Sequence, residues 1–275
     1  MSVSETIASV LTGFDYASRA IVGARDNQED ACQFAKVGSA GTLPLGRHGA
    51  RRSGTLLAVL ADGMGGHAGG AEASSTACAS FVEAYEAGDA TVSGRLAGAL
   101  AASNRAIAAA LDRDRSLAGM GCTLIGAAFT PAGIAWVSVG DSPLLLFRSG
   151  RLYQLNEDHS LGPMLDKLAD QGEISLEEAQ NNPRRHFLLA ALTGGEIEMV
   201  DLASTVVPLR AGDVVLLASD GIDVLDHGEL ADLLAAHADD RPEALADAVL
   251  AAIEALGAPN QDNATVMAVK PVFGG

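Results

Sequence analysis

The chain has few cysteines and no long apolar run, and each shortage excludes a class of protein. Its three cysteines, Cys32, Cys78 and Cys122, are an odd number without metal-ligand spacing, which argues against a disulfide framework and a zinc site. No apolar stretch approaches the ~18 to 20 residues that span a membrane. The N-terminal segment carries Glu5 where a signal peptide has positive charge. We therefore expect a soluble, cytoplasmic protein without a membrane span.

Basic residues are also scarce, because 18 of them stand against 35 acidic residues and the formal net charge is −17. A chain with this excess repels phosphate backbones at long range, so we expect no nucleic-acid partner. The acidic excess has two explanations. It can serve solubility alone, or several carboxylates can converge on bound cations. Composition does not separate the two, whereas the positions of the acids along the chain can.

Apolar periodicity predicts strands first, then two helices, more strands, a polar excursion, strands, two helices and a last strand. Strands are expected at 16–22, 32–37, 56–61, 123–129, 134–139, 144–147, 151–155, 204–207, 214–218 and 264–269, and helices at 72–86, 92–111, 228–236 and 242–256. Residues 123–147 are expected to form an antiparallel meander, and residues 38–53 an exposed loop.

This order of elements favours one fold class. The strands come in consecutive antiparallel runs, which argues against a parallel, doubly wound sheet. We predict an α+β fold, a four-layer α-β-β-α sandwich in which two antiparallel sheets stack face to face and helix pairs cover both outer faces. A chain of 275 residues can bury a large core. We expect a single domain over residues 1–275, with an excursion of short helices at about 158–192.

Acidic residues recur where buried strands end. The apolar run at 56–61 stops at Asp62, which a glycine-rich loop containing His67 follows. Two later apolar runs end in the same way, shortly before Asp141 and Asp220. A single Asp-Gly after an apolar run is typical of a hairpin turn. Their recurrence instead favours a cleft into which several carboxylates point.

Oxygen ligands dominate this set of candidate residues. Its acids are Asp62, Asp220 and Asp262, with Glu29 and Asp30. Without a Cys/His cluster beside them, such a set selects Mg²⁺ or Mn²⁺ over zinc. Crowded carboxylates need cations, because neighbouring like charges raise one another's pKa. Two divalent ions would acidify a water and clamp a phosphate, and the planar guanidinium of Arg25 would hold the remaining phosphate oxygens.

Six short motifs occur in order: RDNQED (25–30), DGMGGH (62–67), GCT (121–123), GDS (140–142), SDG (219–221) and DNAT (262–265). Together they resemble the successive motifs of the metal-dependent protein phosphatases, the PPM or type 2C family, in its bacterial form. The resemblance covers about residues 18–269. It implies a β-sandwich flanked by helix pairs, with two Mn²⁺ or Mg²⁺ ions at one edge. It also implies hydrolysis of phosphoserine and phosphothreonine, in which a hydroxide bridging the ions attacks in line without a covalent phosphoenzyme.

The resemblance also implies roles for individual residues. The metal ligands would be Asp62 as the bridge, Gly63 through its carbonyl, Asp220 and Asp262 on the first ion, and Glu29 and Asp30 on the second, directly or through waters. Asp141, with Asp220, resembles the pair that recruits a third, weaker ion. Arg25 would receive the substrate phosphate. Residues 158–192 match the flap beside the active site, which tunes substrate choice and turnover.

Several positions depart from the family pattern, and two of them bear on the chemistry of the site. Met64 stands where many eukaryotic members have a histidine thought to protonate the leaving group. His67 fits the bacterial pattern, and either His67 or a metal-bound water could supply that proton. Pro143 stands where the family usually has arginine, which bears on the hydrogen bonding around Asp141 and on the third ion.

Three hypotheses follow. The first is an active serine/threonine phosphatase that acts on phosphoproteins and opposes a protein kinase. The second is a pseudophosphatase, a regulatory binding module without useful turnover. Intact Asp62, Asp220 and Asp262 argue for the first, since a non-catalytic descendant is free to lose them. The third is a metal-dependent hydrolase of small phosphate esters, against which the exposed flap argues mildly.

Overall fold

Fourteen strands and six α-helices make up the described part of the computed structural model, which comprises residues 10–38, 41–52, 54–65, 68–85 and 91–274. The strands are β1 Val10–Ile21, β2 Ala31–Gly38, β3 Gly41–Leu45, β4 His48–Arg51, β5 Thr55–Ala61, β6 Gly63–Met64, β7 Gly121–Cys122, β8 Leu124–Thr130, β9 Gly133–Val139, β10 Leu144–Arg148, β11 Arg151–Gln154, β12 Asp201–Leu202, β13 Val214–Ala218 and β14 Ala264–Gly274. The helices are α1 Ala68–Ala84, α2 Val92–Arg113, α3 Gly162–Asp170, α4 Leu176–Gln180, α5 His227–Ala236 and α6 Pro242–Leu256, with short 3₁₀ helices η1 Arg115–Leu117 and η2 Asp220–Ile222.

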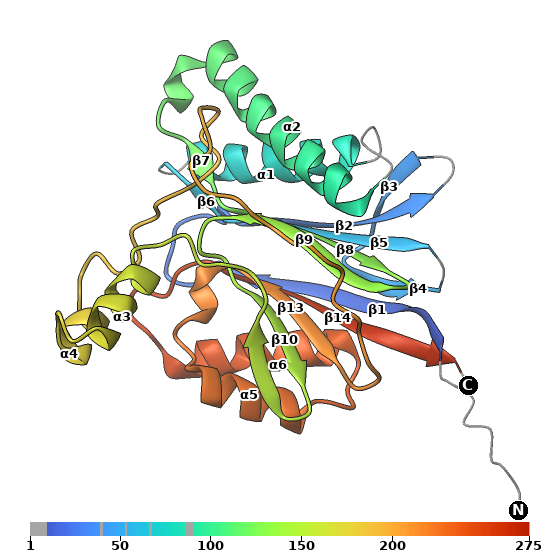
Figure 1. Cartoon of the computed structure of the whole chain (residues 1–275). Helices are drawn as coiled ribbons and strands as arrows, with labels where there is room; N and C mark the ends of the chain where they lie inside the picture. Colours follow the sequence, from blue (N-terminus) through green and yellow to red (C-terminus); the bar gives the residue numbers. More distant parts are fainter. Residues whose placement is uncertain (1–9, 39–40, 53, 66–67, 86–90, 275) are drawn as a thin grey trace, which may run out of the picture.

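Two six-stranded sheets form the middle layers. Their strand orders are β11-β10-β13-β14-β1-β4 and β12-β9-β8-β5-β2-β3, and a small third sheet pairs β6 with β7. Helices α1 and α2 cover the outer face of the second sheet, and α5 and α6 that of the first (Figure 1). Helices α3 and α4 lie outside the layers, at one end of the sandwich. The predicted four-layer α-β-β-α sandwich is therefore confirmed.

Apolar side chains fill both sides of each sheet. Between the sheets, Phe14 of β1 meets Phe129 of β8 edge-on, with ring centroids 5.5 Å apart. Helix α1 inserts Phe81 over Gly126 of β8, where an added Cβ would lie 2.1 Å from the ring. On the other side, buried residues of α6 such as Val249 pack under β13 and β14. This packing fixes the strands and leaves the chemistry to the loops at their ends.

Most predicted helix ends agree with the structure to within two residues, although α1 begins at Ala68 instead of residue 72. Helix α6 begins at Pro242, and Gly257 ends it in a left-handed conformation with φ of 60°. Ser175 caps α4 and forms a reciprocal capping box with Glu178. In the described ranges, no helix has the length and apolar character that crossing a bilayer requires.

Strand pairing was the weaker part of the prediction. Residues 38–53 are not simply a loop, because β3 extends the second sheet beside β2 and β4 extends the first beside β1. The expected meander also breaks, because β10 crosses to the other sheet and pairs with β11 and β13. At 204–207 only Val207 forms a bridge, to Ile134, and the paired strand is β12. Periodicity predicts an extended segment but does not name its partner.

Candidate active site

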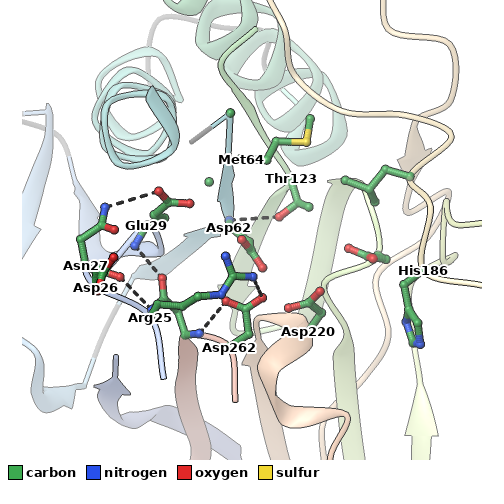
Figure 2. Close-up of a pocket in the computed structure, with 15 residues that line it drawn as sticks. Arg25, Asp26, Asn27, Glu29, Asp62, Met64, Thr123, His186, Asp220 and Asp262 are labelled. Carbon is green, nitrogen blue, oxygen red and sulfur yellow. Dashed lines mark hydrogen bonds and ion pairs between the residues drawn. The ribbon is translucent and has the colours of Figure 1, made fainter. Parts of the chain in front are cut away.

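The acids predicted from the sequence meet at one edge of the sandwich. Asp62 directly follows β5, whereas Asp141 and Asp220 lie shortly after β9 and β13. Asp262 comes just before β14, which pairs with β13. Antiparallel pairing places the end of one strand beside the start of its neighbour, so segments far apart in sequence converge here. They surround a cavity of about 360 Å³ (Figure 2).

Most of the predicted site residues line this cavity. They are Arg25, Glu29, Asp62, Gly63, Asp141, Asp220 and Asp262. Asp30 is not among the lining residues, because its side chain turns toward the strands behind the cavity. His67 lies outside the described residues. The sequence prediction of one shared acidic cleft therefore agrees with the geometry for seven of these positions.

Hydrogen bonds hold the Asp62 backbone in place. Its carbonyl accepts from the Thr123 amide at 2.9 Å, and its amide donates to Thr123 Oγ1 at 3.1 Å. The same hydroxyl lies 2.8 Å from Ser142 Oγ. Thr123 thus ties the end of β5 to the Asp141 loop. Because one buried side chain fixes both loops, the carboxylates of Asp62 and Asp141 keep a fixed position relative to one another.

Asn263 fastens the loop that carries Arg25 and Glu29. Its Oδ1 accepts from the Glu29 amide at 2.7 Å. Its Nδ2 donates to the carbonyls of Val22 at 2.8 Å and Asn27 at 3.0 Å. One amide side chain therefore fixes both ends of the loop beside Asp262.

Close backbone packing explains the glycine after Asp62. A Cβ on Gly63 would lie 2.2 Å from the Gly70 carbonyl oxygen and 2.6 Å from that of Glu29. Such contacts are impossible without moving β6 away from α1 and from the Glu29 loop. The Ser74 hydroxyl also donates to the Glu29 carbonyl, at 2.5 Å. The first turns of α1, the Asp62 loop and the Glu29 loop therefore form one tightly packed unit.

Hydrogen bonds hold the Asp141 loop, in which Pro143 stands. Asn156 Nδ2 donates to the Ser142 carbonyl at 3.0 Å, and Asn156 Oδ1 accepts from the Leu144 amide at 2.7 Å. The Pro143 carbonyl accepts from the Ala218 amide at 3.1 Å. The Asp141 loop is therefore anchored to both β10 and β13.

The carboxylates carry strongly perturbed pKa values. Burial raises the pKa of Asp62 well above its usual range, and the neighbouring Asp220, Asp30 and Asp141 raise it further. Burial, followed by the charge of Asp262, also raises the pKa of Asp220, although a hydrogen bond from Asp62 opposes the rise. The pKa of Asp141 rises to about 7 through burial and the charge of Asp220. Without bound cations, it is therefore unfavourable for all these carboxylates to be ionised together.

Asp30 supports the site from behind. Its Oδ2 accepts hydrogen bonds from Ser219 Oγ and Thr265 Oγ1, both at 2.7 Å. Its Oδ1 is buried without a hydrogen-bond partner among the residues the structure describes. Burial raises the pKa of Asp30 to about 6, against the lowering effect of both hydroxyls. An unsatisfied buried carboxylate oxygen is costly and calls for a positive or donating partner.

Arg25 brings a guanidinium group to the cavity. It forms an ion pair with Asp262 through Nη2 and Oδ2. The two side chains are 53% and 37% exposed. An exposed ion pair contributes ~1 kcal/mol or less, so Arg25 can exchange Asp262 for another anion at little cost.

The oxygen donors of the site fit hard divalent cations, although they are not arranged around a single ion position. No three His, Cys or acidic side chains in the described ranges are arranged to hold an ion as they stand. The raised pKa values and the pairing of Asp262 with Arg25 give the physical reason, because uncompensated carboxylates repel one another and take other partners. All the lining acids offer oxygen, which Mg²⁺ and Mn²⁺ prefer, and Asp30 keeps an oxygen without a partner.

Some residues of the site were not identified from the sequence. Thr123 and Asn263 lie within quoted motifs, but their supporting contacts depend on tertiary structure. His186 lines the cavity from the polar excursion at residues 158–192, and Figure 2 places it across the cavity from Arg25. Its charge lowers the pKa of Asp220. A histidine between Arg185 and Phe187 carries no motif that could have marked it.

Comparison with known families assigns the chain to a protein family. A sequence model of the Protein phosphatase 2C family matches residues 46–264. The chain belongs to this family. The resemblance read from the six motifs is confirmed, and the match includes every predicted metal ligand except Glu29 and Asp30.

Relatives and solved structures agree with this assignment. The serine/threonine protein phosphatase PstP of Mycobacterium tuberculosis H37Rv is 39% identical over 173 residues, 62% of this chain. The matched part spans only 32% of that protein's length. The serine/threonine phosphatase stp of Listeria welshimeri is 35% identical over 184 residues, 65% of this chain and 71% of that one. The crystal structure of the M. tuberculosis phosphatase PstP/Ppp superposes with a TM-score of 0.73 at 32% identity, covering 94% of this chain and 98% of that chain. A structure of the PstP catalytic domain with two manganese ions gives 0.72 at 31% identity, over 94% and 99% of the respective chains.

Proposed function

We propose that the chain is a metal-dependent protein serine/threonine phosphatase. The observation that carries this proposal is the convergence of Asp62, Asp220 and Asp262 on one cavity, with raised pKa values for the first two and Arg25 beside the third. Buried acids in this number need divalent cations, and a lone guanidinium among them suits a phosphate. The names of the family relatives support the same activity.

The residues that would hold two Mn²⁺ or Mg²⁺ ions are Asp62 as the shared ligand, Gly63 through its carbonyl, Asp220, Asp262 and Glu29. We assign Asp30 to the second ion through an intervening water, because its side chain lies behind the cavity and has one oxygen without a partner among the described residues. Asp141 and Asp220 would share a third, weaker ion. When bound, the ions would neutralise the carboxylates, polarise the phosphate and lower the pKa of a water.

The chain's own residues would bind and orient the substrate. Arg25 would leave Asp262 and take two phosphate oxygens in a bidentate contact. Asn263 keeps the Arg25 loop fixed, so that this exchange moves only a side chain. His186 faces the cavity from the flap and joins His67 as a candidate to protonate the leaving serine or threonine oxygen.

The substrates we propose are phosphoserine and phosphothreonine proteins, phosphorylated by an opposing protein kinase. Residues 1–275 would act as a single domain with the flap at 158–192. Cys32, Cys78 and Cys122 are all free thiols, which accords with the proposed cytoplasmic location.

Hydrolysis of p-nitrophenyl phosphate and of a phosphothreonine peptide tests the proposal. We expect Mn²⁺-dependent turnover by the wild type and a loss of at least about 100-fold in Asp220→Asn, an isosteric change that removes one ligand charge. Absence of Mn²⁺-dependent turnover in the wild type would favour the pseudophosphatase instead. Activity on p-nitrophenyl phosphate but on no phosphoprotein would favour a hydrolase of small esters.

A further inference from the structure

A second cavity, of about 580 Å³, opens beside the catalytic cavity on the flap side. We call it the flap groove, after residues 186–191, which line it together with Met64, Thr193, Glu196 and Glu198. Met64, His186 and Leu188 line both cavities. A polypeptide whose phosphorylated residue occupies the catalytic cavity would therefore run into the groove.

Apolar side chains in the groove are held out in solvent. Phe187 is 59% exposed and Leu189 is 45% exposed. Their backbone is fixed, since the Phe187 carbonyl accepts from the Leu161 amide at 2.9 Å and the Leu189 amide donates to the His159 carbonyl at 2.8 Å. These bonds hold the backbone of both residues at the surface, beside the groove. Covering them with an apolar partner is therefore favourable.

Uncompensated negative charge also lines the groove. Glu196 and Glu198 are both exposed and line the groove. Within the described residues, neither forms an ion pair or a side-chain hydrogen bond. The chain as a whole carries a net charge of −17. This rim attracts a lysine or arginine of a partner and repels an acidic one.

We propose that the flap groove binds the residues flanking the phosphorylated one, and so selects the substrate. Preferred substrates carry a large apolar side chain next to phosphothreonine or phosphoserine and a lysine or arginine beyond it. An extended chain advances about 3.3 Å per residue, so the groove receives the first few flanking positions. The proposal rests on the phosphatase function, whose site the groove adjoins.

Matched phosphothreonine peptides test this selection with the whole chain and Mn²⁺. The parent peptide carries leucine and then lysine on both sides of the phosphothreonine, which makes its direction of binding irrelevant. One variant peptide replaces the leucines with serine, and another replaces the lysines with glutamate. The readout is the kcat/KM of each peptide divided by that of p-nitrophenyl phosphate, which is too small to reach the groove. We expect each replacement to lower this ratio by about tenfold.

Substitutions in the protein provide the reciprocal test. Phe187→Ala should lower the ratio about fivefold for the parent peptide but not for the serine peptide. Replacing both Glu196 and Glu198 with lysine should reverse the preference, so that the glutamate peptide becomes the better substrate. A reversed preference cannot result from misfolding. The matched controls are Leu256→Ala and Glu254→Lys, since both residues are exposed on α6 in the opposite outer layer.

Three results would overturn the proposal. One is equal ratios for the three peptides, and another is no reversal in the double-lysine variant. The third is a shift by Phe187→Ala from dimer to monomer in sedimentation with the peptide ratios unchanged, which would make the groove a self-association face. If the wild type hydrolyses nothing, the phosphatase function fails. Peptide selection by the groove is then tested by fluorescence anisotropy, in which the labelled parent peptide must bind more tightly than both variant peptides.

Discussion

Asp30 offers a quantitative test of the buried charge at the site. Its pKa in the folded protein is about 6, against a usual value of 3.8. Between these two pH values the folded state keeps a proton that the unfolded state has released. Stability of the metal-free protein should therefore fall as pH rises from about 4 to 7. The rise in pKa corresponds to roughly 3 kcal/mol, which we reduce to ~2 kcal/mol for the partial contact of this group with solvent.

Urea unfolding in EDTA measures this contribution directly. The perturbation is Asp30→Asn, which keeps an oxygen to accept from Ser219 and Thr265 but cannot ionise. We expect the wild type to lose ~2 kcal/mol more than the variant between pH 4 and pH 7. Burial lowers the pKa of His159, and this opposing effect is common to both proteins, so it cancels.

Addition of Mn²⁺ completes the test. At pH 7, Mn²⁺ at 100 times its dissociation constant should stabilise the wild type by about 2.7 kcal/mol per site. The same pH dependence in Asp30→Asn and wild type would refute the assignment of this charge to Asp30. A metal-free wild type that gains stability between pH 4 and 7 relative to the variant would contradict the sign of the effect.

Three further predictions concern single positions. Arg25→Ala should lower kcat/KM for p-nitrophenyl phosphate about 100-fold through the lost charge-assisted contact with phosphate, and an unchanged value would remove Arg25 from the site. Gly63→Ala should lower the melting temperature by several degrees and abolish activity, because its Cβ would meet a carbonyl oxygen at 2.2 Å. The matched Gly98→Ala in α2, whose Cβ meets nothing within 4 Å, should instead stabilise the fold by ~1 kcal/mol in urea unfolding. Asp213→Ala should cost about 3 to 5 kcal/mol in the same assay, since it strips the buried partner of Arg148 at 2.6 Å, whereas a loss below ~1 kcal/mol would show that the pair is dispensable.

Local rules sufficed for much of the fold. Helix α6 lies at 242–256 as predicted because proline and glycine specify its ends without help from the rest of the chain. Strand pairing did not follow from local rules. The sequence of β10 is that of the next strand of a meander, yet β10 joins the other sheet. The turn that redirects it runs through Gly140, at φ of 103°, beside Thr123. Only the folded structure supplies that contact.

The candidate site was predictable where the same sequence pattern recurs. An acid after each buried strand marked Asp62, Asp141 and Asp220, because strand ends meet at one edge of a sheet. The roles of Asp30 and His186 needed the tertiary structure. Asp30 stands next to Glu29 in sequence, but β2 begins directly after it and its carboxylate binds the hydroxyls of Ser219 and Thr265 instead of lining the cavity.

Anomalous diffraction at the manganese edge from Mn²⁺-soaked crystals would show directly whether this acidic cavity holds a pair of divalent cations. We expect two peaks roughly 3.5 to 4 Å apart, with Asp62 between them and Asp220 and Asp262 beside one. Asp62→Asn should weaken both peaks. Crystals that show no manganese at this edge of the sandwich, or manganese bound only elsewhere on the chain, would rule out the pair of cations.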